Sequence, residues 1–253
     1  MPEIPLNDIC YSSNFLVEVI ARIDFVNPIS TLVDRIPKEL VKDILKRFPI
    51  LEPQKAVEQH VQLSKDEVSS KRTEYTEWKF FGKNREKELR ITPSAILVVC
   101  KEYSSYEKFK DDFLSICKMI STSFDEAQAS RIGLRYVNHI RIKTGDPVRW
   151  NGYISKELLG LFSFKIPGAR FARLFHVMEF TFENFLLRYQ FGMPNPDYPA
   201  QIKQKLFVLD FDAFRHDLLN LTQLEADLDS FHLEIQKLFE SSITEKMRRV
   251  LNG

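Results

Sequence analysis

The residues with the clearest chemical potential lie on one predicted strand, residues 131–142 (RIGLRYVNHIRI). Side chains alternate between the two faces of a strand, so three arginines and one histidine share a face. These residues are Arg131, Arg135, His139 and Arg141. Guanidinium groups match planar anions, which makes this face a candidate site for a phosphate, a carboxylate or an acidic partner. The alternative is a sheet face whose arginines pair with Asp and Glu on neighbouring strands, as Glu18 and Asp24 on an equivalent strand suggest.

Asn138 is the polar residue on the opposite, apolar face of the same strand. A buried amide of this kind is expected to bond to the backbone. The candidate binding residues are therefore Arg131, Arg135, Asn138, His139 and Arg141.

A second group of ionisable residues is formed by Asp210, Asp212 and His216. Carboxylates and imidazoles can bind a metal, but this spacing matches no standard site, and turn residues are expected where a strand ends. Whether these three residues hold a metal is left open, and the sequence predicts no metal site and no cofactor.

Motifs of known catalytic classes are absent from the sequence. There is no GxSxG, no Gly-rich phosphate loop and no HExxH, and the chain has only eight glycines. The cysteines, Cys10, Cys100 and Cys117, form no CxxC pair, and the last two are expected to be small buried hydrophobic residues. These absences favour a non-enzymatic role, although a catalytic site between two halves of the chain remains an open alternative.

The composition limits the classes of partner. Thirty-six basic and 35 acidic residues leave a net charge of +1, so the chain lacks the basic excess typical of proteins that bind mainly phosphates. The N-terminus does not resemble a signal peptide, and no apolar run approaches about 18 residues. We therefore expect a cytoplasmic protein without a membrane segment. The 21 phenylalanines are expected to form core.

The elements that position these residues occur twice. Residues 14–26 and 131–142 both predict strands, and a helix is expected to begin near Pro37 after the first and near Tyr153 after the second. A Phe-Gly pair recurs at Phe81-Gly82 and Phe191-Gly192, and a capping box recurs at Ser104…Glu107 and Thr222…Glu225.

This self-similarity predicts an α+β protein made of two pseudo-repeats, residues 1–128 and 129–253. Each would contain a strand, a helix, three or four antiparallel strands and a long helix. That element order is similar to the duplicated fold of TATA-binding proteins.

Several local features follow from composition and spacing. Residues 65–73 are polar and predict a loop, residues 153–161 predict a short helix, and Glu183-Asn184 predicts a tight hairpin turn. The basic run at residues 246–249 (KMRR) is expected to end the last long helix, where it would interact favourably with the helix dipole.

Several segments resemble a known group of sequences: residues 16–25 (LVEVIARIDF), residues 131–140 (RIGLRYVNHI), Trp78, Tyr103 and the SYEKF of residues 105–109. They are similar to a family of sporadically distributed bacterial conserved-hypothetical proteins of about this length. The family has no assigned activity, so the resemblance implies a patchily distributed, mobile-element or defence-associated gene and no catalytic residues.

Two hypotheses of function follow. The first is a non-enzymatic scaffold that binds another protein, in a bacterial defence or toxin-neutralising system. The alternative is a nucleic-acid or nucleotide binder that uses the basic sheet face. The sequence leaves the partner, the ligand and the oligomeric state open.

Overall fold

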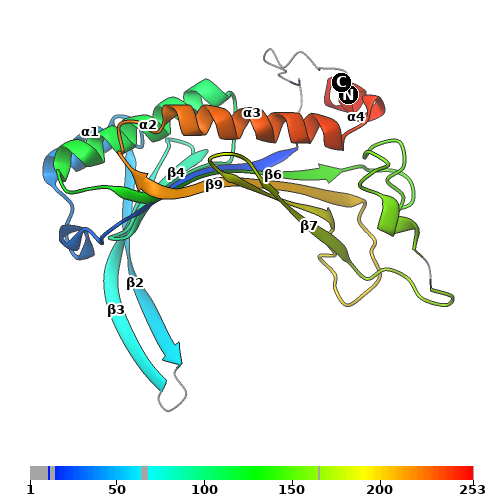
Figure 1. The fold of residues 1–253 in the computed structure, drawn as a ribbon, viewed down its shortest axis with the longest axis horizontal. Coiled ribbons are helices and arrows are strands. Elements are labelled where there is room, and N and C mark those ends of the chain that lie inside the picture. Colours follow the sequence, from blue (N-terminus) through cyan, green and yellow to red (C-terminus); the bar gives the residue numbers. More distant parts are fainter. Residues whose placement is uncertain (1–10, 12–14, 64–67, 165, 253) are drawn as a thin grey trace. The chain divides into compact units, whose positions relative to one another are not determined.

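The computed structural model describes residues 11, 15–63, 68–164 and 166–252, without the side chains of residues 60–63, 68, 69 and 71. Within these residues the protein is α+β, as expected, with one nine-stranded sheet and four α-helices (Figure 1). Neighbouring strands follow the order β2-β3-β4-β5-β1-β6-β9-β8-β7. Among the described helices, none has the length and apolar character needed to cross a membrane.

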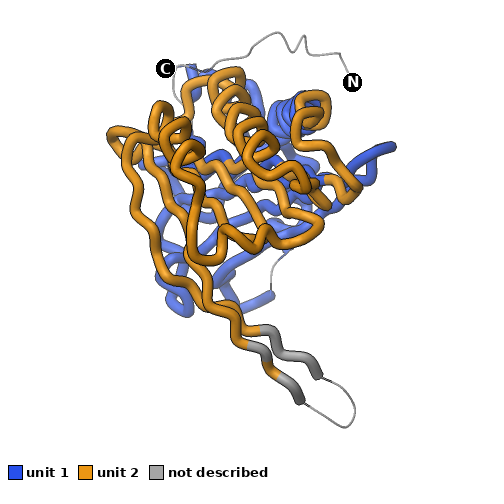
Figure 2. The backbone as a smooth tube through the Cα atoms, turned by 90° about the vertical axis from the view of Figure 1, so that its left-hand side faces the viewer, with its two compact units in different colours: residues 1–19, 134–214, 228–253 blue, residues 20–133, 215–227 orange. Residues whose placement is uncertain are grey.

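The chain divides into two compact units, each assembled from separated segments (Figure 2). Unit 1 contains residues 1–19, 134–214 and 228–253, and unit 2 contains residues 20–133 and 215–227. The expected boundary at residue 128 differs from this division, because β1, β6 and β9 each contribute residues to both units.

Unit 2 contains an antiparallel meander, two helices, and residues 129–133 of β6 and 215–219 of β9. Its elements are β1 (Leu16–Phe25, from residue 20), the 3-10 helix η1 (Ser30–Val33), α1 (Lys38–Leu45), β2 (Ile50–Leu63), β3 (Val68–Phe81), β4 (Lys87–Ile91), β5 (Ala95–Cys100) and α2 (Tyr106–Ser123). Pro37 is the N-cap of α1, so the predicted helix start is confirmed. The N-cap of α2 is Ser105, whose Oγ accepts from the Lys108 N–H at 3.4 Å, so the prediction of Ser104 was wrong by one residue.

The hairpin β2–β3 is longer than the sequence predicted. Residues 68–73, expected to lie in a loop, belong to β3 and pair with β2, whereas residues 64–67 lie outside the described part. Within the described residues, β4 pairs only with residues 78–81 of β3, so the remainder of the hairpin is a two-stranded ribbon (Figure 1). Pairing with the opposite strand satisfies the backbone, and this outweighs the polar composition.

Unit 1 contains four strands, residues 16–19 of β1 and the last two helices. Its elements are β6 (Ala129–Arg141, from residue 134), β7 (Leu174–Thr181), β8 (Leu186–Met193), β9 (Leu206–Leu219, to residue 214), α3 (Glu225–Ser242, from residue 228) and α4 (Glu245–Asn252). The core of the unit is aromatic: Tyr189 stacks on Phe211 with ring centroids 4.6 Å apart, and Trp150 lies 5.1 Å from Phe207. The expectation that phenylalanine forms core is confirmed here.

The expected helix at residues 153–161 is wrong. These residues form turns, followed by the 3-10 helix η2 (Gly160–Ser163). The N–H groups of Tyr153 and Ile154 both bond to the carbonyl of buried Trp150, and Ile154 forms a bridge with Ile243. The Ser155 N–H donates to the Ser242 carbonyl at 2.9 Å, and the Tyr153 carbonyl accepts from the Thr244 N–H at 3.1 Å. These backbone groups are therefore bonded to a distant part of the chain, and a helix does not continue from Trp150.

Two further predictions at the C-terminal end are wrong. Thr222 is not a helix cap, because its hydroxyl and its N–H both donate to Asn220 Oδ1 in a turn before α3. The basic run at residues 246–249 does not end the long helix but belongs to α4, which is separate from α3.

Arg248 of α4 is a partly buried residue that contacts α3. Its Nε donates to Glu240 Oε2 at 2.8 Å and its Nη2 to the Glu240 carbonyl at 2.6 Å. The Tyr11 hydroxyl donates to Glu240 Oε1 at 2.6 Å. Burial and this bond to Glu240 raise the pKa of Tyr11 above its usual range.

The cysteines within the described residues match the expectation of buried small residues. Cys117 is fully buried in α2, and burial raises the pKa of its thiol. Cys100 in β5 is partly buried, and burial again is the largest cause of its raised pKa. Both thiols are therefore poor nucleophiles at neutral pH. Cys10 lies outside the described residues.

Candidate functional site

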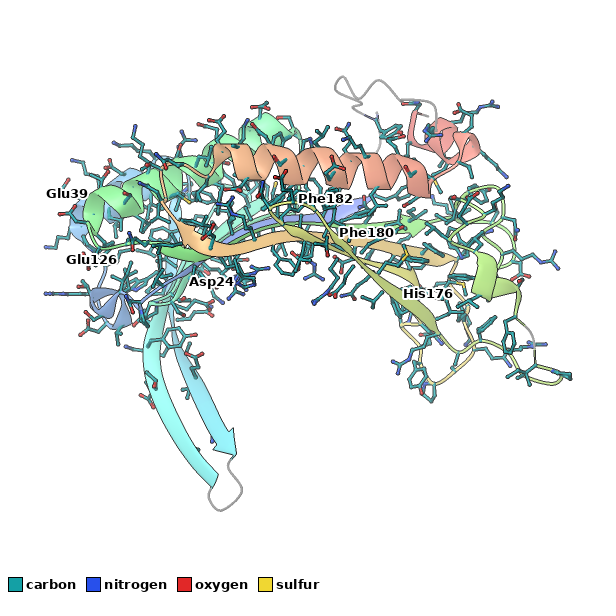
Figure 3. The ribbon with its side chains drawn as sticks, viewed as in Figure 1. Asp24, Glu39, Glu126, His176, Phe180 and Phe182 are labelled. Atoms are coloured by element: carbon teal, nitrogen blue, oxygen red, sulfur yellow. The ribbon has the colours of Figure 1, made fainter. Side chains whose placement is uncertain are left out.

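The predicted basic residues of β6 belong to different units, so each is described with its own unit. Arg131 lies in unit 2, where its Nη1 is 3.7 Å from Asp24 Oδ2. Asp24, labelled in Figure 3, also accepts two hydrogen bonds from Arg22. Arg131 therefore faces an acidic group that another arginine already contacts.

Arg135 lies in unit 1 and forms a two-pronged ion pair with Asp210 of β9. Its Nε and Nη2 donate to the two carboxylate oxygens at 2.8 and 2.6 Å. The hydrogen bonds from Arg135 to Asp210 raise the pKa of the guanidinium. Since Asp210 is only 8% exposed, the arginine neutralises a carboxylate that the fold has removed from water.

The other predicted residues on β6 also have partners in unit 1. Arg141 donates to Gln204 Oε1 at 3.2 Å, and Asn138 Nδ2 donates to the Leu209 carbonyl at 3.4 Å, as expected for a buried amide. Burial, followed by the charge of Arg141, lowers the pKa of His139. An uncharged His139 contributes little to anion binding at neutral pH.

Arg135, His139 and Arg141 lie on the face of unit 1 opposite α3, whereas Asn138 lies on the other face of β6. The register places Gln190 beside Asp210 and Arg188 beside Asp212, and Arg188 Nε donates to Glu179 Oε1 at 2.8 Å. Acidic and basic side chains thus alternate from strand to strand. This arrangement supports the alternative interpretation from the sequence, in which the arginines pair with acidic residues on neighbouring strands.

Replacing Arg135 with alanine is expected to lower the free energy of unfolding by about 1–2 kcal/mol, because Asp210 would remain buried without its cation. Arg141→Ala is the matched control from the same strand, and this exposed residue should cost less than about 0.5 kcal/mol. Urea denaturation of the two variants measures the difference, and equal costs would contradict the role assigned to the Arg135–Asp210 pair.

The possible metal ligands are not gathered into a site. Within the described residues, no group of three His, Cys, Asp or Glu side chains could hold a metal ion. Asp210 is bound by Arg135, which occupies both of its carboxylate oxygens.

A different feature of unit 1, which the sequence analysis did not single out, is the free edge of β7. This strand is last in the sheet order and pairs with β8 on one side. In the turn that joins β7 to β8, the Phe182 N–H donates to the Phe185 carbonyl at 2.9 Å. Backbone bonds between antiparallel strands recur at every second residue, so alternate residues from Phe180 back to Leu174 bond to β8. The residues between them direct their N–H and C=O groups outward. We call these residues, Phe175, Val177, Glu179 and Thr181, the β7 edge.

Two apolar residues of this edge have exposed side chains. Phe175 is 49% exposed and Val177 is 60% exposed, both on the face away from α3. Leu161, Phe164 and Ile166 of the same unit are also exposed. In the described part of the chain, no strand covers the outer side of β7. Natural proteins usually shorten, charge or cover such edges because an open edge pairs with other chains.

The other face of β7 borders a hollow beneath α3. The hollow has a volume of about 220 Å³ and lies within unit 1. Its walls are formed by Phe180, Phe182, Leu187, Glu234, Lys237, Leu238 and Ser241. Figure 3 labels Phe180, Phe182 and His176 along this hairpin. The edge therefore combines open backbone groups with an apolar recess beside them.

His176 is the ionisable residue on the α3 side of β7. Its ring stacks on Phe191 at 5.0 Å and packs against Phe162 at 5.6 Å. Its Nε2 is buried and has no hydrogen-bond partner among the described residues. The surrounding rings make this histidine part of the apolar packing. A comparison with models of protein families and with curated proteins finds no match to this chain.

Proposed function

We propose that this protein is a non-enzymatic interaction scaffold that binds an extended protein segment along the β7 edge. The main observation is that the four alternate residues of the β7 edge, whose backbone groups point outward, have no strand beside them in the described part of the chain. Their N–H and C=O groups can add a further strand by main-chain hydrogen bonding, which is a recurrent mode of peptide recognition.

The side chains around the edge support a protein segment as the ligand. An added strand would place every second side chain toward α3, next to the hollow lined by Phe180, Phe182 and Leu238. Its other side chains would lie beside Phe175 and Val177. Apolar side chains on both sides of the segment would thus gain burial, which contributes roughly 25 cal/mol per Å².

The charges on unit 1 favour a protein over a nucleic acid. Arg135, Arg141 and Arg188 each bond to a side chain of their own unit, and two of those partners are carboxylates. A phosphate would have to displace these bonds. These arginines of unit 1 already have partners, so they do not favour the alternative in which the basic sheet face binds a nucleic acid or nucleotide.

We further propose that the scaffold arose by internal duplication. The strand order supports this idea. In the first half the last strand, β5, lies next to the first, β1, and β4, β3 and β2 follow toward the edge of the sheet. In the second half β9 lies next to β6, and β8 and β7 follow toward the other edge. This order is similar to that of the TATA-binding-protein-like fold, with one strand and the first helix missing from the second half. The resemblance to a patchily distributed bacterial family supports a defence or toxin-neutralising setting.

A photo-crosslinking amino acid at Val177 tests the proposed binding mode in cells that express the full chain. We expect a covalent adduct with a protein, because the side chain lies at the edge that the segment would cover. The same amino acid at Leu233, an exposed apolar residue of α3, is the matched control and should give no adduct. Adducts at both positions, or at neither, would contradict binding at the β7 edge.

A further inference from the structure

We infer that the segment bound at the β7 edge is β7 of a second copy of this chain, paired antiparallel about a twofold axis. The inference rests on the proposed function, because it assumes that the edge binds an extended protein segment. It goes further by naming the partner and the register.

The hydrogen-bonding pattern of β7 restricts how the strand can pair with itself. Only the odd-numbered residues of β7, which form the β7 edge, direct their N–H and C=O groups outward. In a hydrogen-bonded pair both residues must point outward, so odd-numbered residues must face odd-numbered residues of the second copy. A twofold antiparallel pairing satisfies this condition when a residue of β7 lies on the axis.

Placing Met178 on the axis gives the register that the sequence supports best. Phe175 then faces the second copy's Thr181, and Val177 faces the second copy's Glu179. All four outward-pointing residues of each strand take part. On the α3 side, Leu174 faces the second copy's Phe182, which extends the apolar lining of the hollow.

The charges at the two ends of the strand favour the same register. With Met178 on the axis, Arg173, just before β7, comes to the same end of the paired strands as the second copy's Glu183, in the turn just after β7. The twofold axis repeats this pair at the other end. Among the described residues neither side chain has an ion-pair partner, and Arg173 lies over the Tyr198 ring at 4.3 Å. Opposite charges brought together at each end of the paired strands would attract each other.

Neighbouring registers are less favourable. With Val177 on the axis, Arg173 would face Thr181 and its charge would be unmatched. With Glu179 on the axis, that carboxylate would face its own copy, and like charges directly opposite are destabilising. With His176 on the axis, Arg173 would face Glu179, which Arg188 already binds, and fewer residues of β7 would overlap.

Sedimentation analysis of the purified full chain tests the inference with a charge reversal. The wild-type chain is expected to dimerise. Arg173→Glu and Glu183→Arg should each weaken the dimer by about tenfold, because both ends then hold like charges. An equimolar mixture of the two variants should regain the wild-type affinity, since each variant supplies the charge that the other lacks.

Val177→Pro is a second variant that acts on the backbone. The N–H of Val177 points away from β8, so proline should remove a donor at the free edge while the β7–β8 pairing stays intact. We expect this variant to be monomeric, with a far-ultraviolet circular dichroism spectrum like that of the wild type.

Three results would overturn the inference: a wild-type chain that is monomeric at its highest soluble concentration, a dimer that both single charge variants leave unchanged, or a mixture that fails to regain affinity. An adduct between Val177 and a different protein would then leave the proposed function in place and reject only the second copy as the partner. Absence of any adduct would reject both.

Discussion

Replacing Gly192 with alanine is expected to lower the free energy of unfolding by about 3 kcal/mol or more. Gly192 has φ 153°, a conformation that side chains rarely adopt. A Cβ at this position would also overlap the Leu174 carbonyl oxygen of β7 and lie 2.9 Å from the Phe175 Cα. Because both obstacles are backbone atoms of the paired strand, relief requires β7 to move away from β8.

Gly82 provides the matched control, since it follows phenylalanine as Gly192 does. The three atoms nearest to a Cβ there all belong to the side-chain end of Glu86, which can rotate away. Gly82→Ala should therefore change the free energy of unfolding by less than about 1 kcal/mol. Urea denaturation compares the two variants. If the two substitutions lower the free energy of unfolding by similar amounts, the close contact between β7 and Gly192 is not the cause of the loss. The Gly192 variant should also lose the Val177 adduct, because the β7 edge would be displaced.

The two Phe-Gly pairs show what a repeated dipeptide can and cannot predict. In both halves the pair lies near the end of a strand, as expected. The sequence does not show that one glycine faces a flexible carboxylate and the other a backbone carbonyl. That difference depends on which strand is the neighbour, and sequence spacing does not contain this information.

Elements with regular local patterns were predicted well. The helix after Pro37 and the turn at Glu183-Asn184 follow from residues within one turn of each other. The expected helix at residues 153–161 failed because the backbone of Tyr153 and Ser155 bonds to Thr244 and Ser242, far along the chain. Tertiary contacts override a short amphipathic pattern because the intrinsic helix preference amounts to only a few tenths of a kcal/mol per residue.

The candidate site was less predictable for a similar reason. The sequence placed Arg135 and Arg141 on one face of a strand and offered both an anion site and ion pairing as interpretations. The choice of Asp210 as the partner of Arg135 depends on the register between β6 and β9. The β7 edge left no distinct signal, because its alternation of side chains is that of an interior strand. Its position at the end of the sheet is a property of topology.

The second large effect is expected at Arg248. Replacing it with methionine should lower the free energy of unfolding by about 3 kcal/mol, because Glu240 would remain as a buried carboxylate without its cation. Among the described residues, the Tyr11 hydroxyl would then be the remaining donor to the carboxylate. Methionine has a similar length, so the loss reports mainly on charge. Chemical denaturation measures the change.

Two comparisons separate the buried pair from surface charge. Lys237→Met removes the cation of the exposed Glu234–Lys237 pair on α3 and should cost less than about 1 kcal/mol. Adding Glu240→Gln to Arg248→Met should recover part of the loss, because a neutral amide is less costly to bury than a carboxylate. If Arg248→Met proves no more costly than Lys237→Met, Glu240 is solvated when the arginine is absent, and α4 is then held mainly by its apolar residues Met247 and Leu251.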